Sequence, residues 1–115
     1  MAMKVYGIPT CGTCKKALQW LKAHQIDYEF INTKEQPPDR ERIRDWVESL
    51  GAKPLRNTSG QAYRALNNHQ NWTDEQWIDA FAENAMLLKR PLFVQGDRAI
   101  AVGFKEAVLQ EIFGL

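Results

Sequence analysis

The first third of the chain carries apolar residues at the spacings of a strand, a helix and a second strand. The segment of residues 3–7 is short, apolar and aromatic and is bounded by Gly7 and Pro9, which predicts a buried strand. Residues 12–24 then show helical spacing, with an inward face predicted at Cys14, Ala17, Leu18 and Leu21. Residues 27–32 alternate polar and apolar side chains as a strand does. A β-α-β unit of this kind predicts parallel strands and a right-handed crossover.

The pattern in the middle of the chain is helical. Asp39 is a candidate N-cap for a helix that Gly51 is placed to end, and its apolar face consists of Ile43, Trp46, Val47 and Leu50. Residues 54–60 are predicted to be irregular because they contain a strong turn signal at 57–60. Residues 61–67 are compatible with a short helix.

The strongest local signal lies at residues 72–77. Thr73 and Gln76 have the spacing of a capping box, in which each side chain satisfies a backbone N–H of the other residue. Trp72 and Trp77 flank them at the spacing of a hydrophobic staple. This combination predicts a helix that starts after Thr73 and runs to about Asn84.

The end of the chain is predicted to form a hairpin followed by a helix. Two apolar runs, 92–95 and 99–102, are separated by the turn residues Gly96 and Asp97. Residues 104–113 have helical spacing and predict an inward face of Ala107, Val108 and Ile112.

Taken in order, these elements predict one α/β domain with a thioredoxin-like arrangement. Its mixed sheet combines β-α-β and β-β-α units at about residues 1–37 and 89–115, with a helical insert at about 38–88. The 115 residues are 44% hydrophobic and 25% charged, which suits a chain that buries its own core.

Charge and hydropathy exclude some classes of partner. The net charge of +1 gives no basic surface, so direct contact with nucleic acid is not predicted. The N-terminus carries no export signal and no apolar run reaches membrane-spanning length. We therefore expect a cytoplasmic protein without membrane contact.

The two cysteines, Cys11 and Cys14, lie where the first strand is expected to turn into the first helix. In a reducing cytosol, this spacing indicates redox or metal chemistry more often than a permanent disulfide. Because a helix N-terminus stabilises an anion, Cys11 is expected to be the nucleophile, and the less exposed Cys14 is expected to resolve its disulfide. A zinc site needs two more ligands, and His24 and His69 have no recognised spacing to the cysteines, so no metal is predicted. An incidental pair is the remaining alternative.

Three segments of the chain resemble the arsenate reductase (ArsC)/Spx/YffB family. They are Tyr6-Gly7-Ile8-Pro9-Thr10-Cys11-Gly12-Thr13-Cys14-Lys15-Lys16-Ala17, Pro54-Leu55-Arg56-Asn57-Thr58-Ser59-Gly60 and Leu88-Lys89-Arg90-Pro91-Leu92. The similarity covers essentially the whole chain, including Val102-Gly103-Phe104. It implies a thioredoxin-like sheet with an inserted helical subdomain.

The resemblance also implies roles for individual residues. Cys11 matches the catalytic cysteine of the family, and Arg56 and Arg90 match two arginines that bind the oxyanion in the arsenate reductases. Two guanidiniums beside a thiolate favour its ionisation and can bind an anion in bidentate fashion. In a thioredoxin-like fold, Pro91 would be a cis proline beside the nucleophile. The further residues expected to contact substrate are Thr10, Gly12, Thr13, Lys15 and Pro91.

The chain departs from the arsenate reductases in two ways. They carry a third arginine near the last strand, where residues 101–105 here read Ala-Val-Gly-Phe-Lys, and the nearby Arg98 does not match. They also use glutathione and glutaredoxin rather than a local second cysteine, whereas Cys14 here resembles the redox-switch pair of the Spx regulators.

We therefore expect a cytoplasmic thiol-disulfide oxidoreductase that depends on glutathione as co-substrate, holds no bound cofactor, and has glutaredoxin as a further partner. The alternatives are an arsenate reductase and a Spx-like redox-sensing regulator that binds RNA polymerase.

Overall fold

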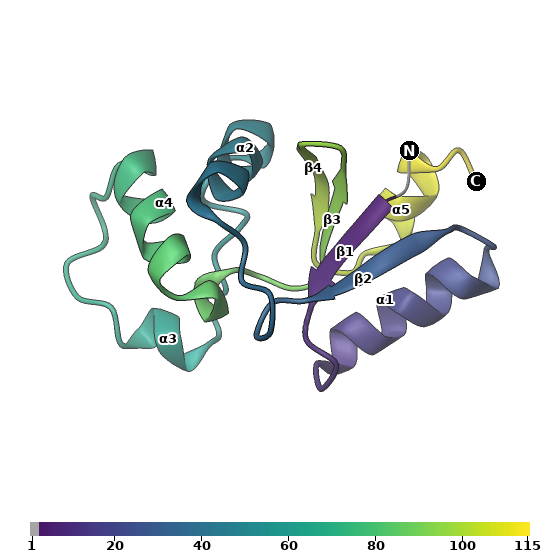
Figure 1. The fold of residues 1–115 in the computed structure, drawn as a ribbon, viewed down its shortest axis with the longest axis horizontal. Coiled ribbons are helices and arrows are strands. Elements are labelled where there is room, and N and C mark those ends of the chain that lie inside the picture. The colour runs from purple at the N-terminus through teal and green to yellow at the C-terminus, as the bar shows by residue number, and fades with distance from the viewer. Residues whose placement is uncertain (1–2) are drawn as a thin grey trace.

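The computed structural model describes residues 3–115, which form a four-stranded sheet, two helices packed on it, and a group of helices at one end (Figure 1). The elements in chain order are β1 (Met3–Gly7), α1 (Gly12–Ala23), β2 (Tyr28–Asn32), α2 (Arg40–Leu50), α3 (Gln61–Arg64), α4 (Asp74–Glu83), the 3₁₀ helix η1 (Ala85–Leu87), β3 (Leu92–Gln95), β4 (Arg98–Val102) and α5 (Glu106–Ile112). None of the helices in this part of the chain is long and apolar enough to cross a membrane.

The sheet has the strand order β2-β1-β3-β4 and is mixed, as predicted. β1 pairs in parallel with β2, and Met3 lies opposite Tyr28. β1 pairs in antiparallel fashion with β3, which pairs in the same way with β4. The α/β, thioredoxin-like fold class predicted from the sequence is thereby confirmed. Helices α2, α3 and α4 gather at one end of the sheet, away from α1 and α5 (Figure 1).

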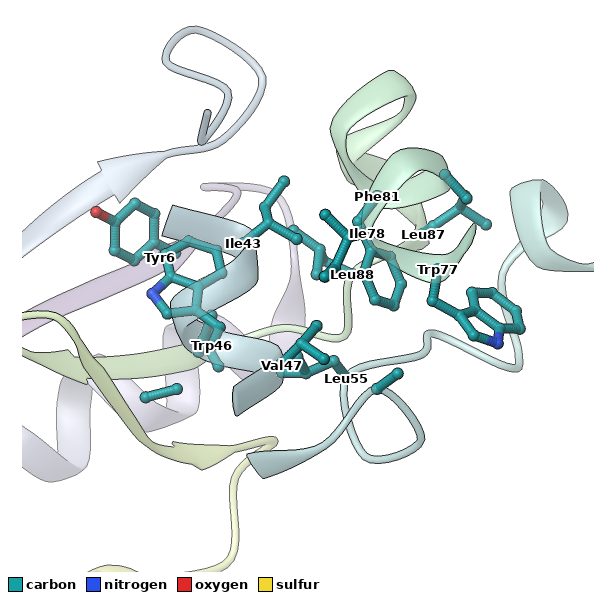
Figure 2. Packing of buried hydrophobic residues seen from close by; sticks show 14 of the residues in the cluster. Tyr6, Ile43, Trp46, Val47, Leu55, Trp77, Ile78, Phe81, Leu87 and Leu88 are labelled. Carbon is teal, nitrogen blue, oxygen red and sulfur yellow. The ribbon is translucent and has the colours of Figure 1, made fainter. Parts of the chain in front are cut away.

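Alternation along β1 divides the core into two clusters. Met3 and Val5 pack with α1 and Leu109 of α5, whereas Tyr6 packs with α2 and α4 on the other side. Figure 2 shows this second cluster, in which Trp46 and Trp77 are almost fully buried. The Tyr6 and Trp46 rings meet edge to face, with centroids 4.8 Å apart. β1 is therefore covered on both faces, which explains its nearly continuous burial.

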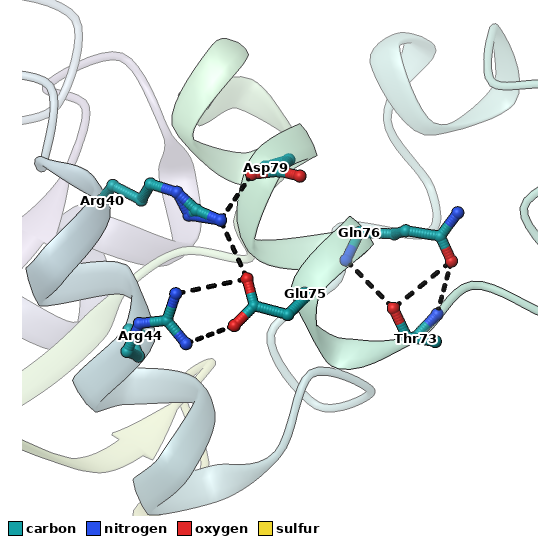
Figure 3. Close-up of polar contacts among 6 residues, drawn as sticks. All are labelled: Arg40, Arg44, Thr73, Glu75, Gln76 and Asp79. Atoms are coloured by element: carbon teal, nitrogen blue, oxygen red, sulfur yellow. Dashed lines mark hydrogen bonds and ion pairs between the residues drawn. The ribbon is translucent and has the colours of Figure 1, made fainter.

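The predicted helix starts are confirmed. Asp39 caps α2 by accepting a hydrogen bond from Arg42 N at 2.9 Å, and Thr73 and Gln76 form a capping box at α4 (Figure 3). The Trp72 and Trp77 rings are 4.9 Å apart, as the staple predicts.

Ion pairs join α2 to α4 across their exposed sides. Arg40 contacts Asp79 at 2.7 Å and Glu75 at 2.8 Å, and Arg44 also pairs with Glu75 (Figure 3). Such exposed pairs add little stability. The buried cluster between α2 and α4 is the main source of their association.

Two helix faces differ from the prediction. In α1 the inner position after Ala17 is taken by Trp20, while Leu18 is only partly buried. In α5 the predicted inward face was wrong: Leu109 is buried, Ala107 is exposed, and Val108 and Ile112 are 42% and 39% exposed. The physical reason is that α5 is two turns long and meets the sheet through Leu109, so residues on its other sides cannot also reach the core.

Candidate active site

Cys11 is the N-cap residue of α1. Its backbone is extended (φ −79°, ψ 119°), and its carbonyl accepts the first helical hydrogen bond from Lys15 N at 3.0 Å. Its side chain closes no capping hydrogen bond. The N–H groups of the first helical turn therefore remain available to stabilise a negative charge. The Cys11 sulfur lies beside them.

The surroundings of Cys11 favour its thiolate. Partial burial opposes ionisation, but the backbone and thiol of Cys14, the Arg90 guanidinium and the backbone of Thr13 together hold the pKa of Cys11 below its ordinary value. Donors from the helix start and one guanidinium thus outweigh the loss of solvation. This is the arrangement expected of a nucleophilic cysteine.

Cys14 has the opposite environment. Its side chain is 1% exposed, and burial, opposed in part by the Ile8 backbone, raises the pKa of its thiol to about 11, with a further rise from the neighbouring Cys11. A Cβ added to Gly7 would lie 2.6 Å from the Cys14 sulfur, so only a glycine at the end of β1 leaves room for this thiol. At neutral pH, Cys14 is a protonated thiol that can donate to the Cys11 thiolate.

A pocket of about 380 Å³ opens beside Cys11. Its lining residues come from the start of α1, the loop after α2, the segment before β3 and the segment after β4, and they are Cys11, Thr13, Asn57, Ser59, Lys89, Arg90, Gly103, Phe104 and Lys105. Three of these residues are lysine or arginine and none is aspartate or glutamate. The Nε and Nη1 atoms of Arg90 are buried without a hydrogen-bond partner among the described residues. Because buried donors are normally satisfied, this pocket fits an anionic ligand.

Backbone hydrogen bonds tie the pocket walls together. Arg56 forms an isolated antiparallel bridge with Leu88. Asn57 N donates to Leu87 O and Lys89 N donates to Leu55 O, each at 2.8 Å, and so fix the loop after α2 beside the segment that carries Lys89 and Arg90.

Gly103 fixes the remaining wall. Its N–H donates to Pro91 O at 2.8 Å, and its φ of +77° favours glycine. A Cβ at Gly103 would lie 3.2 Å from Lys89 Cε, so the missing side chain gives the lysine room to cross this wall.

The structure brings together only part of the site predicted from the sequence. Cys11, Thr13 and Arg90 line the pocket. Thr10, Gly12 and Lys15 are exposed near the start of α1 and do not line it. Pro91 is buried and follows a cis peptide bond, as predicted.

Arg56 lies elsewhere. Its guanidinium carbon is 4.1 Å from the centroid of the Trp77 ring, a cation–π contact inside the helical end of the molecule, and it is not among the residues lining the Cys11 pocket. Its Nε is also buried without a hydrogen-bond partner among the described residues. Its predicted role with the substrate stays a prediction.

Six lining residues were not assigned to the site from the sequence: Asn57, Ser59, Lys89, Gly103, Phe104 and Lys105. All of them fall in the segments that carry the family resemblance or in residues 101–105. Their position in these segments is therefore the sequence signal that could have identified them as site residues. The sequence does not show which of their side chains face Cys11. Lys105 supplies a cation near the last strand, whereas Arg98 lies in a separate hollow with Asp45 and Glu48.

A metal centre has no evident ligand set in residues 3–115. No group of three or more His, Cys, Asp and Glu side chains within that range is placed to hold a metal ion.

Comparison with known proteins gives consistent matches over nearly the whole chain. Residues 6–112 match the ArsC family. YusI of Bacillus subtilis (strain 168), an uncharacterized protein, is 37% identical and is aligned over 96% of this chain and 98% of its own length. The global transcriptional regulator Spx of Lactiplantibacillus plantarum is 28% identical over 89% of this chain and 79% of its own. The crystal structure of a possible arsenate reductase from Streptococcus mutans UA159 superimposes with a TM-score of 0.82, at 34% identity, over 90% of this chain and 91% of that one.

Proposed function

Because the chain belongs to the ArsC family, we propose that it is a cytoplasmic thiol-disulfide oxidoreductase in which Cys11 is the nucleophile and glutathione is the co-substrate. The observation that carries the proposal is a cysteine of lowered pKa lining a cationic pocket, with two Arg90 nitrogens that have no hydrogen-bond partner within residues 3–115. Glutathione carries two carboxylates, which suits a pocket with three cations and no acidic residue.

The first step is attack by the Cys11 thiolate on one sulfur of a disulfide. A new disulfide forms between Cys11 and that sulfur, and the second sulfur leaves as a thiolate that takes up a proton. In the second step, one route is attack by the Cys14 thiolate on the Cys11 sulfur, which forms a Cys11–Cys14 disulfide and releases the bound half of the substrate as a thiolate. In the other route, a glutathione thiolate attacks the sulfur of the bound half, forms a disulfide with it and releases the Cys11 thiolate. The lowered pKa of Cys11 favours this second route, since a thiol of low pKa is a good leaving group.

The environment of Cys14 couples its ionisation to the first step. Two of the causes that raise the pKa of Cys14 are its hydrogen bond to Cys11 and the charge of Cys11. Both disappear when Cys11 enters a mixed disulfide, so the pKa of Cys14 falls when its thiolate is needed. Burial still opposes the ionisation of Cys14, so glutathione or a glutaredoxin can supply the resolving thiol in its place.

A second candidate is a regulator of the Spx type that binds RNA polymerase. The contact between the two cysteine side chains favours it, because an internal disulfide would change the surface at the start of α1. The similarity to Spx of L. plantarum supports the same reading. Arsenate is a third test substrate, since the cations that suit a carboxylate also suit an oxyanion.

Turnover separates these candidates. Purified protein is given glutathione and a glutathione mixed disulfide or arsenate, and is compared with Cys11→Ser and Cys14→Ser. We expect Cys11→Ser to abolish reduction of the mixed disulfide and Cys14→Ser to retain activity that depends on glutathione. Lys105→Gln should raise KM for glutathione, with the exposed Lys16→Gln as the matched control. If the wild type is no faster than Cys11→Ser with any substrate, the reductase proposal fails, and binding of the oxidised and reduced protein to RNA polymerase becomes the test.

A further inference from the structure

A second, apolar hollow adjoins the Cys11 pocket. It has a volume of about 220 Å³, and its apolar lining comes from α2, the loop after it, β4 and α5: Leu50, Pro54, Ile100, Val102 and Val108. Gly103 and Lys105 line both this apolar groove and the Cys11 pocket. The two spaces therefore meet at a cation that lies between the reactive cysteine and an aliphatic surface.

The exposed side of α5 carries a further apolar residue near Val108, which lines the groove. Val108 and Ile112 are four residues apart, which places them on the same side of the helix, and both are well exposed. Since Leu109 already anchors α5 to the sheet, the exposed pair adds nothing to the core. A contiguous apolar surface beside a reactive site is typical of a binding surface.

The sheet ends at β4 on the side of the groove. Among residues 3–115, no strand pairs with the outer edge of β4. Ser49 Oγ accepts a hydrogen bond from Ala99 N at 3.3 Å and so covers the start of that edge. The groove begins at Ile100, beyond this contact. An extended peptide can bind an open strand edge through its backbone and place a side chain in an adjoining hollow.

We propose that this groove binds an extended segment of a protein that carries the disulfide substrate, with an aliphatic side chain against Ile100, Val102 and Val108 and a carboxylate at Lys105. The inference rests on the function proposed above and names its substrate class, a disulfide between a polypeptide cysteine and glutathione.

In the reaction, Cys11 attacks the sulfur of the glutathione half, and the polypeptide leaves as a thiolate that is protonated by water. A second glutathione then loses its proton and attacks the glutathione sulfur of the Cys11 mixed disulfide, which forms oxidised glutathione and releases the Cys11 thiolate. Glutathione has no aliphatic side chain, so it occupies the cationic pocket and leaves the groove to the polypeptide.

The test compares glutathionylated peptides that share one sequence with an acidic residue and differ only in Leu or Ser near the cysteine. The Leu is placed one to four residues from the cysteine in separate peptides, and kcat/KM is measured with glutathione as reductant. At one of these spacings we expect the Leu peptide to react about tenfold faster than its Ser counterpart, the size of effect that a modest apolar contact gives. Val108→Ser should remove this preference, Val108→Leu should keep it, and Ala107→Ser, an exposed change on the same helix outside the groove, should leave it intact.

A second measurement does not depend on turnover. The affinity of the Leu peptide with serine in place of its cysteine is measured on Cys11→Ser protein with and without Val108→Ser, and we expect about tenfold weaker binding when Val108 is changed. If the protein turns over the peptides with no preference for Leu at any spacing, and Val108→Ser has no effect, the proposed role of the groove is overturned while the reductase function stands. Binding that depends on Val108, without turnover of any disulfide by the wild type, overturns the reductase function instead. If sedimentation shows a dimer that Val108→Ser dissociates, the groove holds a second copy of the chain and the proposal is wrong.

Discussion

Replacing Gly7 by alanine tests whether the end of β1 is shaped by the buried sulfur of Cys14. The new Cβ would lie 2.6 Å from the Cys14 sulfur, a separation at which one of the two groups must move. The backbone of Gly7 does not move easily, because Gly7 is paired in the sheet with Asn32 and its carbonyl accepts a hydrogen bond from Thr33 N at 2.9 Å. Overpacking of this kind costs about 1–3 kcal/mol of unfolding free energy.

The expected change is measurable by thermal and urea unfolding. For a chain of this length, the unfolding entropy is about 0.24 kcal/mol/K, so a loss of about 2 kcal/mol lowers Tm by about 8 °C. Displacement of Cys14 should also expose its thiol. We therefore expect faster reaction of Cys14 with a thiol reagent in Gly7→Ala than in the wild type.

The decisive control is the same substitution in a Cys14→Ala background. Without the sulfur, the nearest atoms to the new Cβ are Phe30 Cε1 at 3.4 Å and the Cβ of residue 14 at 3.6 Å, which are ordinary contacts. The double mutant should therefore be no less stable than Cys14→Ala, so the coupling energy between the two sites should equal the whole cost of Gly7→Ala, about 1–3 kcal/mol. An equal loss of stability in both backgrounds would refute the reasoning, because the cost would then lie in the backbone of Gly7.

The remaining predictions concern the two thiols and one helix cap. At pH about 6.5, iodoacetamide should modify Cys11 before Cys14, because only the pKa of Cys11 is lowered; faster labelling of Cys14 would reverse the roles. Arg90→Met should raise the pKa of Cys11, measured as thiolate absorbance against pH, since it removes a side-chain donor to the sulfur. The pKa of Cys14 is about 11 in the folded protein against an ordinary 9.0, so the unfolded chain loses this proton first, and the unfolding free energy should fall as pH rises from 9 to 11. Cys14→Ala should flatten that fall, and an unchanged slope would count against the raised pKa. Thr73→Ala removes the capping box with Gln76 and should cost about 1 kcal/mol, or about 4 °C in Tm, whereas Thr73→Ser should cost little.

Local chemistry explains which elements the sequence could predict. The capping box at Thr73, the cap at Asp39 and the run of β1 depend on residues within one or two turns of each other, so their pattern is sufficient. The inner face of α5 could not be derived in this way. Its apolar residues outnumber the positions that one short helix can turn toward the sheet, and only the packing of Leu109 decides which of them are exposed.

The candidate site likewise combines features that local sequence sets with features that only the fold sets. The roles proposed for Cys11 and Cys14 rest on their places on α1, because the N-cap position and the inner face of a helix are set by local sequence. The cations around them come from segments far apart in the chain. Lys89 and Lys105 line the same pocket as Cys11 because the loop after α2 pairs with the segment before β3 and because β4 returns beside β3. Arg56, from the same loop, turns to Trp77 instead.

The sequence by itself therefore determined the four strands, the longer helices and the start of α1 at Cys11, and it predicted the order in which the two thiols react. The tertiary structure decided which side chains surround those thiols, which face of α5 stays exposed, and that an apolar groove meets the cationic pocket at Lys105. The physical reason is range. Backbone hydrogen bonding and capping act between neighbours in the chain, whereas the field around a thiolate is the sum over whatever groups the fold brings within a few ångströms of it.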